Sequence, residues 1–239
     1  MKILITGATS GIGRQLALDY QAEGHQVWGV GRSADALETL VQRGITPLRV
    51  DLSERQAACA CFSQLESLDL AILSAGTCEY IDMPDFNGDL FARVMRANVE
   101  SMANSIEALL PALRKSSSAQ LVGIGSSAAY LPLPRAEAYG SSKAAIAYLM
   151  KTLRITLKAD NINVSLVCPG FVKTPLTDRN DFPMPFLIDV TEASRVIRKG
   201  IAKNQAEIHF PRRFTYMMKL MSLLPQKVWD TLAQRMIKT

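Results

Sequence analysis

The sequence predicts an α/β protein in which helices cover both faces of a doubly wound parallel sheet. Three observations support this fold class. A short apolar strand, Lys2 to Thr6, leads through a glycine-rich turn directly into the start of a helix. Further short apolar runs follow, separated by longer helical segments, as expected for strands that are buried on both faces. The chain has 239 residues, of which 48% are hydrophobic, enough for one domain with a sizeable core.

Composition argues against several classes of function. The net charge of +5 is too small to indicate a nucleic-acid partner by itself. The Cys59-x-Cys61 pair is too tight for the usual zinc spacing, and Cys78 and Cys168 stand alone, so we expect no metal site. We expect these cysteines to be the reduced thiols of a cytoplasmic protein. Because the first strand begins at residue 2, no signal peptide is expected, and no apolar run reaches the length of a membrane span.

The turn after the first strand has the pattern Thr-Gly-x-x-x-Gly-x-Gly, with glycines at Gly7, Gly11 and Gly13. Glycine lets the backbone turn sharply and approach a pyrophosphate closely. The helix that begins near Ile12 would direct its free N–H groups and the positive end of its dipole toward that phosphate. The alternative is an ordinary glycine-rich connection between a strand and a helix.

The second strand, over residues 26–30, leads into Gly31-Arg32-Ser33. A cofactor with a free ribose 2′-hydroxyl usually meets an acidic residue at this position. A carboxylate would repel a 2′-phosphate, whereas Arg32 and Ser33 can bind one, so the sequence favours NADP over NAD. Ser33 is also a candidate N-cap for a helix over 34–43, and the two roles are compatible.

A long helix over 137–158 carries Tyr139 and Lys143, which are four residues apart. That spacing places both side chains on one face of the helix, about 6 Å apart along its axis. An ammonium group near a phenol favours the phenolate and so lowers the pKa of the phenol. A phenol tuned in this way can exchange a proton with a substrate oxygen near neutral pH. The alternative is a pair of side chains on the surface of an ordinary helix.

Two further residues complete a recognisable set. Ser126 lies thirteen residues before Tyr139, and Asn98 opens an Asn-Val-Glu sequence within a helical run. Together with the glycine pattern, these residues resemble the short-chain dehydrogenase/reductase (SDR) family, in its single-domain subgroup of about 250 residues. The resemblance runs from residue 2 to about residue 210.

The resemblance implies a Rossmann-type sheet with strand order 3-2-1-4-5-6-7. An NAD(P)-binding catalytic domain would occupy residues 1–210, followed by a basic amphipathic helical tail over 211–239. Apolar runs predict the remaining strands at 45–50, 70–73, 121–125, 163–167 and 206–210. Helices are expected over 84–114 and 191–203 in addition to those named above.

The resemblance also assigns catalytic roles. Ser126 would donate a hydrogen bond to the substrate oxygen. Tyr139 would act as general acid in reduction and as general base in oxidation. Lys143 would lower the Tyr139 pKa and hold the ribose hydroxyls of the cofactor. Asn98 would perturb its helix so that its backbone carbonyl holds a water of the proton relay; the alternative is an exposed asparagine.

Cofactor contacts follow from the same resemblance. Asp51 would contact the adenine amino group, with Ser53 as the N-cap of the next helix, and residues 169–174 would hold the nicotinamide carboxamide. Ser74 stands where the family has asparagine, so a weaker hydroxyl bond would replace the amide that braces the sheet. The expected cofactor-binding residues are Thr6, Gly7, Thr9, Ser10, Gly11, Ile12, Gly13, Arg32, Ser33, Asp51, Leu52, Ser74, Ala75, Gly76, Tyr139, Lys143, Pro169, Gly170, Val172 and Thr174.

The tail from residue 211 onward is unusually basic, with six cationic residues and a single acid, Asp230. Residues 214–224 and the segment after Pro225 are strongly apolar when drawn as helices. Such helices can lie on anionic membranes, bury against the domain or form an oligomer interface. We expect packing on protein, or the interface of a homodimer or homotetramer, in preference to a peripheral membrane contact.

These observations predict an NADP-preferring oxidoreductase that transfers a hydride between nicotinamide and a carbonyl or alcohol carbon of a small molecule. The expected substrate pocket is apolar, which suggests a hydrophobic substrate, and consists of Tyr130, Leu131, Phe171, Met184 and Phe186. Residues 176–190 would either cover this pocket as a lid or pack into the core. Two other classes are alternatives: a regulator that binds NADP without catalysis, and a lipid-handling protein at a membrane surface. The intact Ser-Tyr-Lys set argues against a pure regulator.

Overall fold

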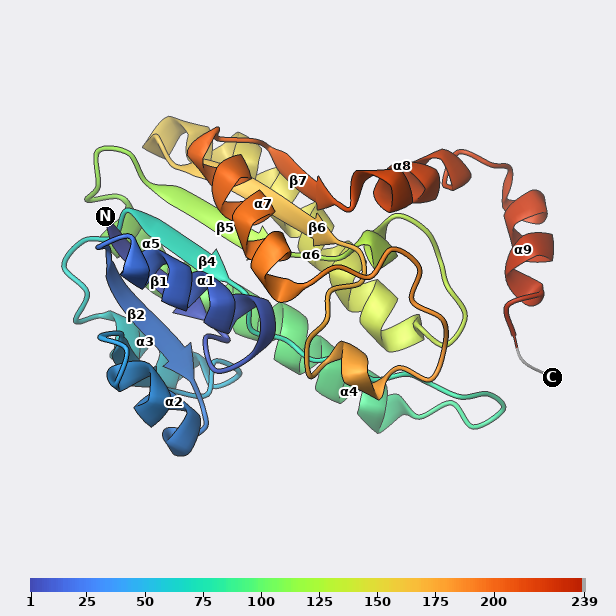
Figure 1. Ribbon diagram of the computed structural model, residues 1–239, viewed down its shortest axis with the longest axis horizontal. Helices are drawn as coiled ribbons and strands as arrows, with labels where there is room; N and C mark the ends of the chain where they lie inside the picture. The colour runs from blue at the N-terminus through green and yellow to red at the C-terminus, as the bar shows by residue number, and fades with distance from the viewer. Residues whose placement is uncertain (238–239) are drawn as a thin grey trace.

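The computed structural model describes residues 1–237, and its centre is a parallel sheet of seven strands (Figure 1). The strand order is β3-β2-β1-β4-β5-β6-β7, which confirms the predicted topology. The strands are β1 (Lys2–Thr6), β2 (Gln26–Gly31), β3 (Thr46–Arg49), β4 (Leu70–Leu73), β5 (Gln120–Ile124), β6 (Asn163–Pro169) and β7 (Glu207–Phe210). Strand β1 pairs with β2 on one side and with β4 on the other, so the order reverses at this point. A crevice for ligands therefore forms at the carboxyl ends of these strands.

Helices cover both faces of the sheet. One face carries α1 (Gly11–Ala22), α2 (Ala34–Val41) and α7 (Val190–Ala202), and the other carries α3 (Arg55–Phe62), α5 (Ser101–Leu113) and α6 (Glu137–Thr156). In β1, Ile3 and Ile5 pack toward the first set of helices, whereas Leu4 packs toward the second. Successive side chains of a strand alternate between faces, so a strand with helices on both sides is apolar throughout.

The helix expected over 84–114 is interrupted. Helix α4 (Gly88–Met95) begins after Asn87, whose side-chain oxygen accepts a hydrogen bond of 2.8 Å from the Leu90 amide. A π-helical turn, Arg96–Glu100, follows and contains Asn98, and α5 completes the segment. Such turns occur inside α-helices, frequently at functional sites, because they shift the direction of the following side chains.

Other boundaries differ from expectation by a few residues. Strand β6 continues to Pro169 because it stays in register with β7, with Pro169 opposite Phe210. Helix α6 ends at Thr156, and a 3₁₀ turn follows until Asn161 adopts the left-handed conformation with φ of 54°. Positive φ values end helices, and asparagine tolerates them better than most residues.

The tail lies at one end of the molecule, beyond β7 (Figure 1). It forms α8 (Arg212–Met221) and α9 (Gln226–Gln234). Phe214 and Met218 of α8 are buried together with Leu131 and with Trp229 of α9. The Trp229 indole donates a hydrogen bond of 2.9 Å to the Pro132 carbonyl. One side of each tail helix therefore packs on the loop that follows β5. Within residues 1–237, no helix combines the length and the apolar character that crossing a membrane requires.

Candidate active site

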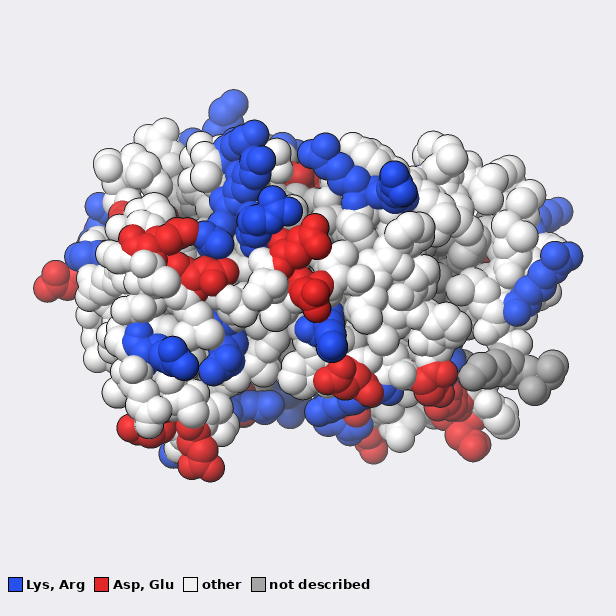
Figure 2. Space-filling model, viewed as in Figure 1, with Lys and Arg blue, Asp and Glu red and all other residues white. Residues whose placement is uncertain are grey.

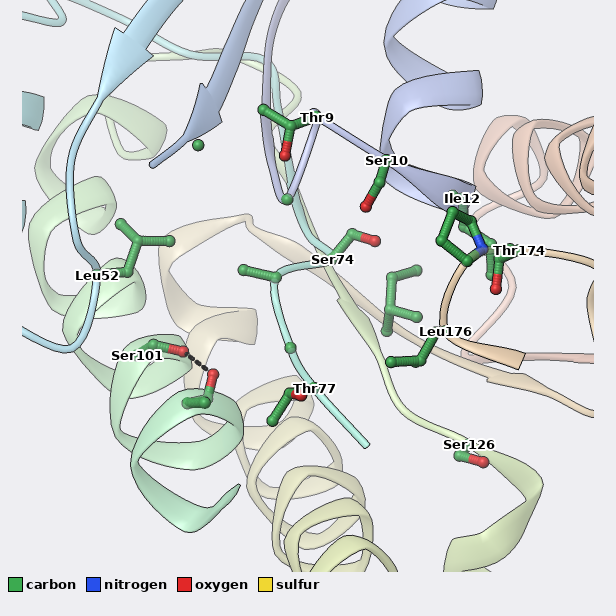
Figure 3. Close-up of a pocket in the computed structure, with 18 of the residues that line it drawn as sticks. Thr9, Ser10, Ile12, Leu52, Ser74, Thr77, Ser101, Ser126, Thr174 and Leu176 are labelled. Carbon is green, nitrogen blue, oxygen red and sulfur yellow. Dashed lines mark hydrogen bonds between the residues drawn. The ribbon is translucent and has the colours of Figure 1, made fainter. Parts of the chain in front are cut away.

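A cavity of about 540 Å³ opens at the carboxyl ends of the strands, where the strand order reverses. Figure 3 shows Thr9 and Ser10 of the glycine turn on one side of it, with Leu52 and Ser126 at opposite ends. Most of the site residues expected from the sequence line it: Gly7, Thr9, Ser10, Gly11, Ile12, Arg32, Asp51, Leu52, Ser74, Ala75, Gly76, Ser126, Tyr139, Lys143, Pro169, Gly170, Val172 and Thr174. Thr6, Gly13, Ser33 and Asn98 do not line it, and each has a different structural role.

The glycine turn brings β1, α1 and the end of β4 into close contact. Gly7 has φ of 65°, and a Cβ atom there would lie 2.8 Å from the Ala75 nitrogen. A Cβ atom at Gly13 would lie 2.4 Å from the Gly7 carbonyl oxygen, so Gly13 permits the approach of helix to turn without lining the cavity. Ser10, at the N-cap of α1, makes no side-chain capping bond. The amides of the first turn are therefore available to an anion.

Thr6 braces the sheet. Its hydroxyl oxygen accepts hydrogen bonds from the backbone amides of Ser74, at 3.0 Å, and Ala75, at 3.1 Å. The hydroxyl that braces the ends of β1 and β4 therefore belongs to Thr6 and not, as expected, to Ser74, and Thr6 does not line the cavity. The Ser74 hydroxyl lies at the cavity instead (Figure 3), with no hydrogen bond to another described residue.

Arg32 and Asp51 face each other across the end of the cavity near β2. Nη1 of Arg32 lies 3.7 Å from a carboxylate oxygen of Asp51, and the Arg32 side chain is 78% exposed. Ser33 points elsewhere, because its hydroxyl caps α2 by accepting a bond of 3.3 Å from the Ala36 amide. The predicted capping role of Ser33 is therefore confirmed, and its contact with a 2′-phosphate stays a prediction.

The prediction that Ser53 caps the following helix is wrong. Helix α3 has Glu54 at its N-cap, without a side-chain bond. Instead, the Ser53 amide and hydroxyl donate to the Asp51 carboxylate at 3.0 and 2.7 Å. These hydrogen bonds hold the pKa of Asp51 below its ordinary value, with a smaller contribution from Arg32. Asp51 thus remains ionised at the cavity edge.

Tyr139 and Lys143 lie on α6 and share one wall of the cavity. The Lys143 ammonium lies 5.6 Å from the centre of the Tyr139 ring and donates a bond of 3.1 Å to the Ile124 carbonyl. Burial lowers the pKa of Lys143 to about 8. We expected Lys143 to lower the Tyr139 pKa, but burial dominates and raises it, while a hydrogen bond with Ser126 lowers it. The Tyr139 hydroxyl therefore keeps its proton at neutral pH.

Ser126 lies two residues after β5 and lines the cavity beside Tyr139. Its neighbour Ser127 does not line the cavity. The Ser126 oxygen accepts a bond of 3.1 Å from the Ala128 amide. Because a hydroxyl carries one donor and two acceptor positions, Ser126 can still donate its proton to a ligand oxygen.

Asn98 is fully buried behind this wall. Its amide accepts a bond of 2.7 Å from the Thr77 amide and donates bonds of 3.0 Å to the Thr77 carbonyl and 2.9 Å to the Ser142 hydroxyl. The side-chain oxygen lies so close to Gly76 that a Cβ atom there would be 2.8 Å from it and 3.7 Å from the Lys143 ammonium. Asn98 thus positions residues 76–77, in the loop after β4, against α6, and the alternative of an exposed asparagine is wrong.

Comparison with known proteins now decides the family. The sequence model of short chain dehydrogenases matches residues 1–182. The chain belongs to the short-chain dehydrogenase/reductase family.

An uncharacterized oxidoreductase of Myxococcus xanthus is 32% identical over 243 residues, which cover 98% of this chain and 96% of the relative. An Arabidopsis thaliana protein named 11-beta-hydroxysteroid dehydrogenase-like 3 is 29% identical, over 95% of this chain and 78% of its own length. A solved short-chain dehydrogenase from Sphingobium yanoikuyae, in complex with NADPH, superimposes with a TM-score of 0.79 and 24% identity, over 94% of this chain and 96% of that one.

The SDR cavity also has residues that the sequence motifs did not reveal. Arg93, Arg96 and Arg179 line it, and Arg93 pairs with Glu79 at 2.7 Å. These arginines lie outside the family motifs, so only their tertiary positions identify them. Thr177 holds the segment after β6 in shape, because its hydroxyl donates to the Val172 carbonyl at 2.7 Å.

The five residues that were expected to form an apolar substrate pocket do not line this cavity. Tyr130, Leu131, Phe171, Met184 and Phe186 are absent from the lining of the SDR cavity. Phe171 stacks against Phe214 of the tail, with ring centres 5.5 Å apart, and Phe186 lies 6.3 Å from the same ring. Phe214 was missed because nothing local in the sequence connects it with this region.

The segment over 176–190 borders the cavity through Leu176, Thr177 and Arg179. Two contacts tie it to neighbouring loops: Asn180 accepts a bond of 2.9 Å from the Tyr80 hydroxyl in the loop after β4, and Arg135, in the loop after β5, pairs with Asp181 at 2.7 Å. Of the two alternatives, a cover at the cavity edge describes its first residues, whereas Phe186 and Leu187 remain exposed.

Proposed function

We propose that this SDR is an NADPH-dependent oxidoreductase that interconverts a carbonyl group and an alcohol on a largely apolar small molecule. The observation that carries the proposal is the convergence of Ser126, Tyr139 and Lys143 on one wall of the cavity that also contains the glycine turn. Nothing in a pure nucleotide sensor requires an acid, a cation and a hydroxyl donor on one wall.

The residues present fit a dinucleotide with a 2′-phosphate. The turn at Gly7 and Gly11 has positive φ and leaves no space for a Cβ atom at Gly7, and the amides of α1 that follow are uncapped. Arg32 reaches the cavity where a 2′-phosphate would require a cation. The NADPH found in the structure of the Sphingobium yanoikuyae relative is consistent with this choice. When bound, NADPH supplies the hydride.

The protein's own groups supply the proton. Tyr139 stays protonated because burial raises its pKa, so its hydroxyl can donate to a substrate oxygen during reduction. The Ser126 hydroxyl can donate to the same oxygen and stabilise its developing charge. Lys143, protonated below about pH 8, stabilises the phenolate that Tyr139 becomes when it has donated its proton. Asn98 fixes residues 76–77 beside Lys143 and acts as a positioning residue.

Apolar surroundings favour an apolar substrate. Phe171, Phe182 and Phe214 form a ring cluster that does not line the cavity but packs behind Gly170, which does; a Cβ atom at Gly170 would lie 2.8 Å from the Phe214 ring. The Arabidopsis thaliana relative is named for a hydroxysteroid dehydrogenase, which agrees with a bulky apolar carbonyl compound. The free thiols of Cys59, Cys61, Cys78 and Cys168 support a cytoplasmic location. The homodimer or homotetramer stays a prediction.

The decisive experiment measures NADPH consumption by the full-length protein against a panel of apolar ketones and aldehydes. Tyr139→Phe keeps the ring and removes the exchangeable proton, so we expect turnover to fall at least about a hundredfold while NADPH still binds. Tyr148→Phe, on the exposed side of the same helix, is the matched control and should leave turnover unchanged. NADPH binding without turnover of any compound would instead support the regulator, and full activity of Tyr139→Phe would remove Tyr139 from the mechanism.

A further inference from the structure

Helix α8 exposes several apolar side chains to solvent, while two of its polar side chains face the domain. These two polar side chains are Thr215, whose hydroxyl lies 2.7 Å from Nδ1 of His209, and Lys219, whose ammonium lies 2.7 Å from the Glu207 carboxylate. Of its apolar residues, Phe214 and Met218 are buried, but Tyr216, Met217 and Leu220 face outward, and Leu220 is 70% exposed. A helix on the surface of a protein in water normally has the opposite arrangement.

Helix α9 repeats this feature. Trp229 is buried and bonded to the loop that follows β5, which fixes the orientation of the helix. Val228 and Leu232 lie on its exposed side, four residues apart and therefore on one face, and Met236, in the turn after the helix, is exposed as well. Between the helices, Leu223 is 79% exposed. The exposed apolar surface of the tail, which we call the tail face, consists of Tyr216, Leu220, Leu223, Val228, Leu232 and Met236.

Helix α8, which carries part of the tail face, also lies beside the cavity: a Cβ atom at Gly170, which lines the cavity, would be 2.8 Å from the Phe214 ring. The ring centre of Phe214, on the buried side of α8, lies 6.3 Å from that of Phe186 in the segment over 176–190. Phe186 and its neighbour Leu187 are both exposed. Many exposed apolar side chains in one short stretch of the chain indicate an interaction site, because scattered single side chains are the usual exposed apolar residues of a soluble monomer.

Charge identifies the kind of partner. The exposed cations of the tail are Arg212 and Arg213 on α8, Lys227 on α9 and Arg235 directly after α9, and none of them makes an ion pair within residues 1–237. The single acid of the tail, Asp230, accepts a hydrogen bond from Gln226. Figure 2 shows the corresponding surface as mostly uncharged, with Lys and Arg side chains at its borders.

We propose that the tail face docks on an anionic phospholipid bilayer. Outward apolar side chains bordered by unpaired cations match the two layers of a membrane surface, the acyl boundary and the anionic headgroups. A second copy of this chain matches less well, because two tails would bring cations of like sign together across an apolar contact. The contact would be peripheral, and it would place the cavity edge near the lipid. The proposal concerns binding and does not depend on the catalytic proposal.

The test is co-sedimentation of the full-length protein with phosphatidylcholine vesicles, with and without phosphatidylserine. We expect binding to the anionic vesicles, much weaker binding to the neutral ones, and weakening by salt, which screens the headgroup charge. Leu220→Ser/Leu223→Ser should weaken binding at least about tenfold, since it removes two exposed apolar groups. The matched control is Tyr148→Ser/Ile155→Ser on α6, whose side chains are 77% and 74% exposed, and it should bind normally.

A second pair of variants isolates charge. Arg213→Ala/Lys227→Ala/Arg235→Ala should weaken binding to the anionic vesicles roughly a hundredfold, at about fivefold for each cation. Arg43→Ala/Lys115→Ala/Lys158→Ala removes the same charge from exposed positions outside the tail and should have a much smaller effect. Circular dichroism and thermal unfolding establish that each variant is folded.

Three outcomes would overturn the proposal. The first is absence of binding to anionic vesicles by the wild-type protein. The second is equal binding to neutral and anionic vesicles, because the tail cations would then have no role. The third is a change of Leu220→Ser/Leu223→Ser from dimer to monomer in analytical ultracentrifugation without loss of vesicle binding, which would assign the tail face to a second copy of the chain.

Discussion

Gly31 packs directly against Thr9, so that a Cβ atom at position 31 would lie 2.4 Å from the Thr9 methyl carbon. Gly31 ends β2 and Thr9 belongs to the glycine turn, and both line the cavity. Glycine at position 31 therefore has two consequences. It leaves no carboxylate to repel a 2′-phosphate, and it lets the turn approach β2 more closely than any other residue would allow.

This contact determines how cofactor preference can be tested. Gly31→Asp alone should weaken binding of both NADPH and NADH, because the new side chain collides with Thr9. Gly31→Asp/Thr9→Ser removes the methyl group, and the nearest remaining atoms then lie at 3.4 to 3.5 Å. We expect this double variant to shift the ratio of NADH to NADPH affinity at least about tenfold toward NADH, since the carboxylate repels a phosphate and can accept from ribose hydroxyls.

The measurement is a fluorescence titration of each variant with both reduced cofactors at fixed ionic strength, with Thr9→Ser as the control. A double variant that binds NADPH as tightly as the wild-type protein would show that position 31 does not face the 2′-phosphate.

Arg32 is expected to supply most of the preference for NADPH. Its side chain is largely exposed and its only ion pair, within residues 1–237, is the 3.7 Å contact with Asp51, so it is free to turn toward a phosphate. Hydrogen bonds to charged groups contribute roughly 1.5–3 kcal/mol. Arg32→Ala should therefore weaken NADPH binding about tenfold to a hundredfold and leave NADH nearly unchanged.

Arg43→Ala is the control for Arg32→Ala, because it removes an equal charge from the turn before β3, away from the cavity. Isothermal titration at two salt concentrations separates contact from long-range attraction. Equal weakening of both cofactors by Arg32→Ala would argue against a 2′-phosphate contact.

The parts of the fold and site that could be predicted are those specified by local sequence. A strand buried on both faces is apolar throughout, which made β1 and β4 recognisable. The Tyr139–Lys143 spacing fixed a shared helix face, and the glycine spacing fixed the turn at Gly7. In each case the physical constraint acts between residues that are close together in the chain.

The parts that could not be predicted depend on contacts between distant segments. Phe214 packs so closely on Gly170 that a Cβ atom there would lie 2.8 Å from its ring, although the two residues are far apart in the sequence. Serine is a common N-cap residue, yet the Asp51 carboxylate accepts hydrogen bonds from both the amide and the hydroxyl of Ser53. Local propensity could not distinguish these competing partners.

Burial of Lys143 predicts a stability that depends on pH. Its pKa is lowered from 10.5 to about 8, so between these values the unfolded chain holds a proton that the folded protein has released. The free energy of unfolding of the wild-type protein should therefore rise with pH in this window, by up to about 1.4 kcal/mol per pH unit. Lys143→Met should lack this rise.

Urea unfolding at a series of pH values from 7 to about 10 measures the effect as the difference between the two proteins. Taking the difference removes the contributions of other titrating groups, provided that Lys158→Met, at an exposed position, follows the wild-type profile. Parallel profiles for Lys143→Met and the wild-type protein would show that the ammonium is not desolvated.

Thr6 and Ser74 provide the last test, because two neighbouring hydroxyls are predicted to differ sharply in their importance. Thr6→Val keeps the shape of a buried side chain but removes the acceptor of the Ser74 and Ala75 amides. Each amide left without a partner costs about 1–3 kcal/mol, so Thr6→Val should lower the free energy of unfolding by at least about 2 kcal/mol. Ser74→Ala removes a hydroxyl without a partner among the described residues and should change stability by less than about 0.5 kcal/mol. Urea unfolding of both variants, with unchanged m-values, checks the comparison. A loss of similar size in the two variants would mean that residue 74, as in the family pattern, braces the ends of β1 and β4, and that the Thr6 bonds contribute little.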